Sequence, residues 1–336
     1  MKLQDFHGEV WINAHEEVVS AMVKSNDEVI DGGYGLDSYS RLATELMQQY
    51  FDEPIYTTFA INGTAANVMA LKAMLQRYDS IICAEQTHVN TYEAGAFEYN
   101  LGNKILPVKT ADGKLTPEIL DNYLLSIKKY KYNPKVITLA QPTEFGTLYS
   151  IEELKQICNY AHANGMYVYL DGARIGNAVV ALNTNLKEMI EYTDIDAFSF
   201  GGTKAGAMFG EMIIFRRKEF SSNLKYSQKQ SLQHMSKSKF LSVQIYTILK
   251  NNLWIELSKK SNEKAGELAE KISKKSYKIY YERQTNMVFI VISPEKLALL
   301  EEKYDMHYWD EHAHVLRLAT TYQTTTEQID KLLSYL

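Results

Sequence analysis

Residues 197–210 contain a single charged side chain, that of Lys204, and glycines lie close to it on both sides. Two strand-like segments, 197–200 and 211–215, frame this run. Glycine lets a backbone approach another group closely, and burial lowers the pKa of an amine, which makes it a nucleophile toward carbonyl carbons. The pattern indicates a reactive lysine, although a lysine in an ordinary tight turn would also fit these residues taken alone.

A second run, Tyr167-Val-Tyr-Leu-Asp171-Gly-Ala-Arg174, leads four strand-forming residues into an acid. Ligands of open α/β sheets bind outside the carboxyl ends of the strands. A strand-terminal aspartate often caps the next turn, but pyridoxal phosphate needs both a lysine for its Schiff base and an acid for its pyridinium nitrogen. Asp171 and Lys204 together therefore point to this cofactor far more specifically than either residue alone.

Two further motifs suit the same ligand. Asn62-Gly63-Thr64 lies between a predicted strand and a predicted helix, where backbone N–H groups and the helix dipole form an anion site for a phosphate. The same residues could simply cap the helix. His88 follows the predicted strand 80–84, so it could stack on a flat ring or relay a proton, or it could be a loop histidine with a local hydrogen bond.

Arg317 is a lone cation in the apolar segment 315–319. Guanidinium groups recognise carboxylates with two parallel hydrogen bonds, so Arg317 is a candidate for binding an acidic group of a substrate. An internal salt bridge is the structural alternative. His307, His312 and His314 do not form the HExxH pattern, and we expect no metal site.

The composition limits the class of protein. The chain has 336 residues, more than one typical core, which predicts two unequal domains. Its net charge of −5 argues against a nucleic-acid partner, because non-specific binding rests on Lys and Arg that neutralise phosphates. Cys83 and Cys158 lack CxxC spacing, so we expect neither a disulfide framework nor a zinc site. Without a signal-peptide pattern or an apolar stretch near the roughly 20 residues of a membrane span, we expect no membrane partner and a cytoplasmic protein.

The elements that must position these residues alternate between strand and helix over roughly 200 residues, which predicts a mainly parallel central sheet flanked by helices. We expect this α/β arrangement in a large cofactor-binding domain, residues 15–239, with residues 1–14 packed near the active site. A long helical pattern at 240–275 opens a smaller C-terminal α+β domain, residues 240–336. The predicted strands of the large domain are 55–61, 80–84, 104–108, 135–140, 167–171, 197–200 and 211–215.

These motifs, in this order, resemble the threonine aldolase branch of the β-eliminating lyase family, whose members are fold-type I enzymes that depend on pyridoxal phosphate. The likeness extends over nearly the whole chain, and the DGAR and GGTK elements at this separation are its most specific parts. The matching stretches are 33–39, 62–64, 88–95, 170–174, 199–204, 285–289 and 316–318.

The resemblance implies a role for each residue of the cofactor site. Lys204 would form the Schiff base with pyridoxal 5'-phosphate, and Asp171 would hold the pyridine nitrogen. Gly63 and Thr64 would bind the phosphate, and His88 would stack on the ring.

The resemblance also implies how substrate and subunits meet. Arg174 and Arg317 would orient the cofactor and the carboxylate of a small amino-acid substrate. The family is dimeric or tetrameric, with active sites at the subunit interface, so Tyr34, Lys229 and Lys237 would reach the cofactor of a neighbouring subunit.

The sequence departs from the family pattern in two places. Residues 203–206 read Thr-Lys-Ala-Gly, where many threonine aldolases have a Ser-Lys-Gly type of sequence. Near the start, the family has a Ser-Asp that helps to bind the substrate carboxylate, whereas this chain offers Gln4-Asp5 followed by His7-Gly8. The second departure leaves the substrate pocket less defined than the cofactor site.

The implied reaction is retro-aldol cleavage of a β-hydroxy-α-amino acid, threonine or allo-threonine, to glycine and an aldehyde. His88, or a water that it holds, would remove the β-hydroxyl proton. Other activities remain open at this point. A β-eliminating lyase, an aminotransferase or a racemase acting on another small amino acid would use the same cofactor, and a non-catalytic sensor would bind pyridoxal phosphate without turnover.

Overall fold

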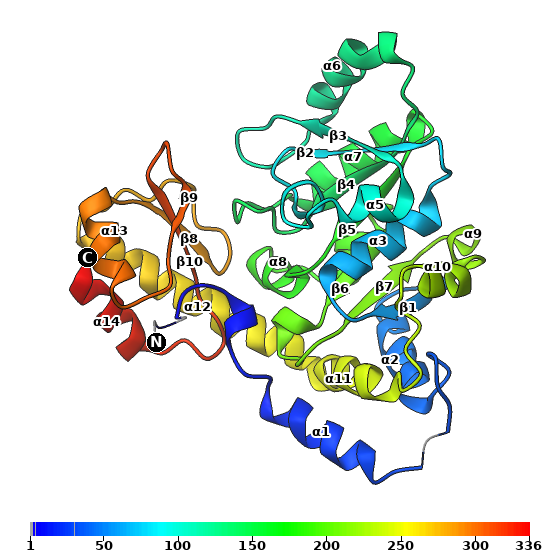
Figure 1. Cartoon of the computed structure of the whole chain (residues 1–336), viewed down its shortest axis with the longest axis horizontal. Helices are drawn as coiled ribbons and strands as arrows, with labels where there is room; N and C mark the ends of the chain where they lie inside the picture. The colour runs from blue at the N-terminus through cyan, green and yellow to red at the C-terminus, as the bar shows by residue number, and fades with distance from the viewer. Residues whose placement is uncertain (1–2, 4, 30) are drawn as a thin grey trace.

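The computed structural model describes the whole chain except residues 1, 2, 4 and 30, and Figure 1 shows two parts of unequal size. The larger part is built on a seven-stranded sheet with the strand order β1-β7-β6-β5-β4-β2-β3. The neighbouring pairs from β3 to β6 are parallel, whereas β7 runs antiparallel to both β6 and β1. The mainly parallel sheet predicted from the sequence is therefore confirmed. The strands are β1 (Tyr56–Ala60), β2 (Ser80–Ala84), β3 (Lys104–Val108), β4 (Pro134–Ala140), β5 (Tyr167–Asp171), β6 (Ala197–Gly201) and β7 (Glu211–Phe215).

Both faces of this sheet are apolar, and helices cover both. Successive residues of a strand point to opposite sides, and in β2 and β4 both sides are buried. Ile82 and Ile137 belong to a core shared with α7, while Ile81 and Val136 belong to a core shared with α3. Strands of this kind are typical of a parallel sheet between two helical layers. The helices of this part are α1 (Glu16–Asn26), α2 (Ser38–Gln48), α3 (Gly63–Met74), α4 (His88–Thr91), α5 (Ala96–Leu101), α6 (Pro117–Ile127), α7 (Ile151–Ala163), α8 (Ile175–Ala181), α9 (Lys218–Ser221), α10 (Leu224–Gln230) and α11 (Lys239–Leu249).

The smaller part is an α+β unit, as the sequence predicts. Its antiparallel sheet has the order β8-β10-β9. Leu268, Leu300 and Leu332, from the three helices of this part, pack in one core with apolar side chains of β8 and β10. These elements are α12 (Leu253–Lys274), β8 (Met287–Val291), α13 (Pro294–Glu301), β9 (Tyr308–Asp310), β10 (Val315–Ala319) and α14 (Thr326–Tyr335).

The helical pattern predicted at 240–275 is two helices rather than one. Asn251 and Asn252, between α11 and α12, adopt left-handed backbone angles with φ of 56° and 58°, a conformation that asparagine tolerates better than most residues. Side chains of α11 belong to the core of the large sheet, and those of the C-terminal half of α12 to the core of the small part. Figure 1 shows α12 passing from one part to the other. The domain limits predicted from the sequence stay a prediction.

The N-terminal segment joins the two parts. Leu3 exchanges backbone hydrogen bonds with Lys303 and Asp305, and the N–H of Ala319 donates to the carbonyl of Phe6 at 2.8 Å. The next turn, Glu9–Trp11, contacts the turn Thr203–Ala205 of the large part. The segment thus runs along the small part before it reaches the large one. Among the described helices, none has the length and apolar character needed to cross a membrane.

Candidate active site

The carboxyl ends of neighbouring strands bring the predicted cofactor residues to one edge of the sheet. β5 ends at Asp171, and β6 is followed by the turn that carries Lys204. Parallel strands end at the same edge, which is where open α/β sheets bind ligands. A cavity of about 260 Å³ lies at this edge. Its wall includes Gly63, Thr64, His88, Asp171, Arg174 and Lys204, the six residues predicted to bind the cofactor.

A glycine allows the loop that carries Lys204 to pack tightly against the loop that follows Asp171. A Cβ atom on Gly201 would lie only 2.3 Å from the carbonyl oxygen of Ala173. A side chain at this position would force the two loops apart, so glycine is required for the close approach. The two reactive groups are therefore held at a fixed separation by backbone contact.

Lys204 presents an amine that is suited to attack a carbonyl carbon. Burial, and then the nearby charge of Arg174, lower the pKa of the Lys204 amine from its ordinary value. Within the described part of the chain, its amine has neither a hydrogen-bond partner nor an ion pair, and it lines the cavity. A partly desolvated amine without a partner is the kind of nucleophile that forms a Schiff base.

Asp171 is held in one orientation by two donors. The N–H of Ala173 donates to Asp171 Oδ1 at 2.9 Å, and the side chain of Asn67 donates to Oδ2 at 3.0 Å. The residue is 8% exposed. A buried carboxylate with its oxygens partly satisfied can accept one more charged donor, as the protonated nitrogen of a pyridine ring would be.

Asn67 links Asp171 to a second acid, Glu93, which the sequence did not single out. The amide nitrogen of Asn67 also donates to Glu93 Oε1 at 2.7 Å, and the hydroxyl of Tyr169 donates to Asn67 Oδ1 at 2.8 Å. Asn67 lies one turn into α3, after the predicted anion site. Asn67 is the neutral group between two buried acids and fixes the orientation of both.

Glu93 in turn holds His88. His88 Nδ1 lies 2.8 Å from Glu93 Oε1, and among the described residues the other ring nitrogen, Nε2, has no hydrogen-bond partner. Burial lowers the pKa of His88, but the hydrogen bond to Glu93 and the charges of Glu144 and Asp171 outweigh it, so the pKa is raised. Burial raises the pKa of Glu93, whose Oε2 atom is buried without a partner within the described residues.

The opposite end of the cavity suits a phosphate. Gly63 and Thr64 are the first two residues of α3, a helix of 12 residues, and Asn62 caps it by accepting the N–H of Ala65 at 2.9 Å. The first N–H groups of a helix have no partner within the helix, and its dipole favours an anion there. Open space surrounds the position of a Cβ atom on Gly63. The free amine, the buried acid and this helix end together fit pyridoxal phosphate.

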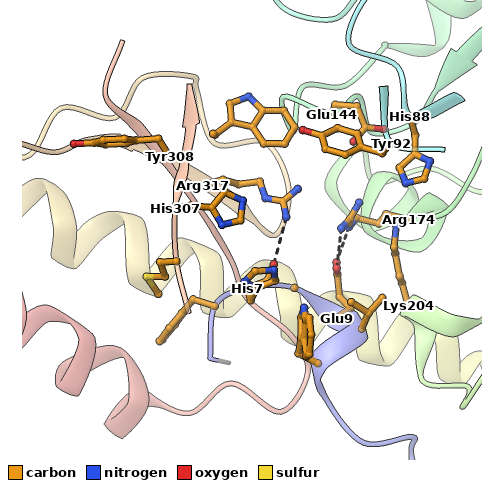
Figure 2. A pocket seen from close by; sticks show the side chains of 16 residues that line it. His7, Glu9, His88, Tyr92, Glu144, Arg174, Lys204, His307, Tyr308 and Arg317 are labelled. Carbon is orange, nitrogen blue, oxygen red and sulfur yellow. Dashed lines mark hydrogen bonds and ion pairs between the residues drawn. The ribbon is translucent and has the colours of Figure 1, made fainter. Parts of the chain in front are cut away.

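A second cavity, of about 380 Å³, continues from the first toward the small part of the molecule. Figure 2 shows it between the N-terminal segment, the loops of the large sheet and the strand that carries Arg317. Side chains from three separate stretches of sequence therefore meet in one space. Val10, His88, Glu144, Arg174 and Lys204 line both cavities.

Arg174 is engaged by an acid that the sequence did not reveal. Arg174 Nε and Nη2 donate to the two carboxylate oxygens of Glu9 at 2.7 and 2.9 Å, and Asn286 of the small part donates to Glu9 Oε1 at 2.6 Å (Figure 2 shows the ion pair). Burial alone would raise the pKa of Glu9, but the charge and hydrogen bonds of Arg174 outweigh burial and lower it to about 2.

The residues that this chain offers in place of the family's Ser-Asp, Gln4 and Asp5, are not the ones that engage Arg174. Gln4 lies outside the described residues. Asp5 accepts a hydrogen bond from Gln328 of α14 at 2.9 Å and lines neither cavity. Glu9, four residues later, is the acid that reaches the arginine.

Arg317 is a cation without an acidic partner in the described part of the chain. Its guanidinium carbon lies 5.1 Å from the centre of the Trp309 ring, and Nη2 donates to the carbonyl of His7 at 3.3 Å. Burial, and then repulsion from Arg174, lower the pKa of Arg317. A partly buried guanidinium with donors left over is a site for a carboxylate, and the internal salt bridge considered as an alternative is not found among these residues.

Three predicted residues do not join the site within one chain. Tyr34, Lys229 and Lys237 line neither cavity in the part of the chain that the structure describes. Tyr34 is 51% exposed and its ring stacks on His234, with ring centres 4.2 Å apart. Their predicted contact with the cofactor of a neighbouring subunit stays a prediction.

Comparisons with known proteins show what this chain is similar to. A family model described as beta-eliminating lyase matches residues 13–295. A low specificity L-threonine aldolase of Pseudomonas aeruginosa is 33% identical over 303 residues, which cover 89% of this chain and 87% of that protein. A solved structure of threonine aldolase from Leishmania major superposes with a TM-score of 0.92 at 26% identity, covering 99% of this chain and 98% of that one. An aspartate aminotransferase of Thermus thermophilus has a TM-score of 0.72 at 15% identity over 96% of this chain and 92% of that one. At this identity the match shows that the two proteins share a fold and nothing more.

Proposed function

We propose that this chain, which belongs to the beta-eliminating lyase family, is a pyridoxal-phosphate-dependent aldolase that cleaves threonine or allo-threonine into glycine and an aldehyde. The observation that carries the proposal is a pair of unpartnered cationic groups. The amine of Lys204 and the guanidinium of Arg317 line one continuous cavity, and neither has an acidic partner among the described residues. An α-amino acid whose amino group took the place of Lys204 on the cofactor would bring its carboxylate to Arg317.

The residues of the first cavity would hold the cofactor. Lys204 would form the covalent link, Asp171 would hold the pyridine nitrogen, and Gly63 and Thr64 would receive the phosphate, with His88 against the ring. When bound, pyridoxal phosphate supplies an electron-accepting ring that stabilises negative charge on the α-carbon of the substrate.

The residues of the second cavity would orient the substrate. Arg317 would bind the carboxylate with two parallel hydrogen bonds, and Arg174 would add positive charge from its remaining edge, because Glu9 already occupies Nε and Nη2. A fixed carboxylate fixes the orientation of the α-carbon. That orientation decides which of the bonds to the α-carbon can break. Orientation of this kind contributes on the order of 7–11 kcal/mol in well-aligned reactions.

The proposal includes assembly into a dimer or tetramer with active sites between subunits. The loop with Tyr34 lies against the segment before α11, since the N–H of Gly35 donates to Ser238 Oγ at 2.7 Å. Each of these two segments carries an exposed apolar residue, Leu36 at 74% and Leu232 at 90% exposure. A second copy of the chain would cover them and would receive Tyr34, Lys229 and Lys237 beside its own cavity. Sedimentation of the purified protein tests the assembly.

Product analysis tests the activity. The protein, loaded with pyridoxal phosphate, is incubated separately with L-threonine and L-allo-threonine, and glycine and acetaldehyde are measured. We expect both products, and we expect Lys204→Ala to lose them together with the visible absorbance of the lysine-bound cofactor. Lys260→Ala, at an exposed lysine paired with Glu256, is the matched control. Absence of both products from the wild type would refute the aldolase; release of pyruvate and ammonia from serine would favour β-elimination.

A further inference from the structure

We propose that Glu144 is the base that takes the proton of the substrate's β-hydroxyl group, an inference that rests on the proposed aldolase activity. The sequence singled out His88, or a water that it holds, for this task. The hydrogen bonds and ion pairs of the side chains that line both cavities favour the carboxylate of Glu144 instead.

The position of Glu144 is the first reason. The cofactor end of the site is the cavity with Asp171 and Gly63, and the carboxylate end is the cavity with Arg317. The atoms that react must lie where these two cavities meet, so the side chains that line both cavities surround them. Glu144 is one of these few side chains, and Figure 2 shows it on the same side of the cavity as His88 and Tyr92.

The lack of a competing partner is the second reason. Of the polar side chains that line both cavities, Arg174 is a cation paired with Glu9, and Lys204 would hold the cofactor until the amino group of the substrate takes its place. His88 Nδ1 is bonded to Glu93, and the ring of His88 would lie against the cofactor. Glu144 has no hydrogen bond or ion pair to any other described side chain. As a carboxylate it offers only acceptors, which is what the proton of a hydroxyl group needs.

The turn that carries Glu144 is built to aim it into the cavity. The N–H of Thr143 donates to the carbonyl of Thr147, and the N–H of Gly146 donates to the carbonyl of Thr143, both at 2.9 Å. Thr143, Phe145 and Thr147 are buried, at 3%, 6% and 8% exposure. Glu144, unlike these three buried neighbours, is partly exposed, and its side chain lines both cavities.

The proposed step balances without any further reactant. The proton moves from the β-hydroxyl oxygen to a carboxylate oxygen of Glu144, and the electron pair of that O–H bond becomes the second bond of the aldehyde carbonyl. The Cα–Cβ bond breaks, and its electron pair stays with Cα until Cα takes up a proton from water to give glycine. Glu144 then releases its proton to water.

Glycine provides the probe that separates this step from the rest of the reaction. Glycine binds through the same amino group and carboxylate but has no β-hydroxyl group, so exchange of its α-hydrogen with D₂O does not need the proposed base. The experiment compares the wild type, Glu144→Gln and His88→Asn, each loaded with pyridoxal phosphate. It measures threonine cleavage, glycine exchange by proton NMR, and glycine affinity from the change in visible absorbance. Glu152→Gln, at an exposed residue of α7, is the matched control, and thermal unfolding of the apoproteins checks the fold.

We expect Glu144→Gln to lose threonine cleavage by about 10²–10⁴-fold, the usual contribution of a general base, while glycine exchange and affinity stay within about threefold. Cleavage within about threefold of the wild type would overturn the proposal. An equal loss of threonine cleavage and glycine exchange in Glu144→Gln would also overturn it, because Glu144 would then shape the site rather than act as the base. A selective loss of threonine cleavage in His88→Asn, and not in Glu144→Gln, would overturn it as well. If the wild type cleaves neither threonine nor allo-threonine, the aldolase itself fails; if it cleaves them and the variants do not follow this pattern, only the role of Glu144 fails.

Discussion

Replacing Glu9 by glutamine removes the acid that holds Arg174, and the structure sets the size of the effect. The pKa of Glu9 falls from its ordinary 4.5 to about 2 because Arg174 outweighs the cost of burial. Each unit of pKa corresponds to about 1.4 kcal/mol, so ionised Glu9, with the cost of burial and the charges of Arg174 and Lys204 included, stabilises the folded protein at neutral pH by about 3 kcal/mol relative to a neutral carboxyl group. The side chains of Glu9 and Arg174 are 3% and 12% exposed, so solvent screens the pair little. Glu9→Gln would also leave the guanidinium of Arg174 buried without a counter-charge.

The pH dependence gives the prediction a second signature. The pKa of Glu9 is lower in the folded protein than in the unfolded chain, so its contribution is complete above about pH 4.5 and disappears as the pH falls toward about 2. We therefore expect the difference in free energy of unfolding between the wild type and Glu9→Gln to be constant near neutrality. It should shrink as the solution is made acidic through this range. Urea unfolding of the apoproteins at a series of pH values measures it.

A control separates this buried pair from ordinary surface charges. Glu270 pairs with Lys274 on α12, and both side chains are about 70% exposed, at 69% and 71%. Exposed pairs of this kind often contribute nothing measurable, so Glu270→Gln should unfold like the wild type. The reasoning would be refuted by a Glu9→Gln variant as stable as this control at pH 7, or by a stability difference that persists unchanged into acid.

Two further predictions concern binding and the charge network. Arg317→Ala should raise the KM for threonine by about 10- to 100-fold, because a hydrogen bond to a charged group contributes about 1.5–3 kcal/mol. Steady-state kinetics measures this change, and a change in kcat alone would contradict the role of Arg317 in binding the carboxylate. Asn67→Ala removes a donor from both Asp171 and Glu93, and among the described residues it leaves Glu93 Oε1 as an acceptor for His88 alone. The pKa of His88, followed by NMR titration of the apoprotein, should then move above the wild-type value, and an unchanged pKa would mean that Asn67 does not control Glu93.

The fold class and the cofactor end of the site were predictable because they depend on local patterns. Apolar runs bounded by turn residues marked the strands, and their alternation with helices implied a parallel sheet. In such a sheet the carboxyl ends of the strands meet, so Asp171 and Lys204 had to lie near one another. The prediction needed no knowledge of side-chain packing, and the structure places both residues in one cavity.

Secondary structure that depends on single backbone angles was not predictable in the same way. The helical pattern at 240–275 kept its apolar spacing across Asn251 and Asn252, and nothing in that spacing distinguishes one helix from two. The break arises because both asparagines adopt positive φ values, which lets α11 pack beneath the large sheet while α12 crosses to the small part.

The sequence by itself determined which residues have the chemistry for the cofactor and on which strand ends they lie. Only the tertiary structure decided the charge balance around them: Glu9 reaches Arg174, Asn67 joins Asp171 to Glu93, and Arg317 has no acidic partner among the residues that the structure describes. The physical reason is distance along the chain. These contacts join segments separated by many residues, and no periodicity or spacing records which distant polar groups burial will bring together.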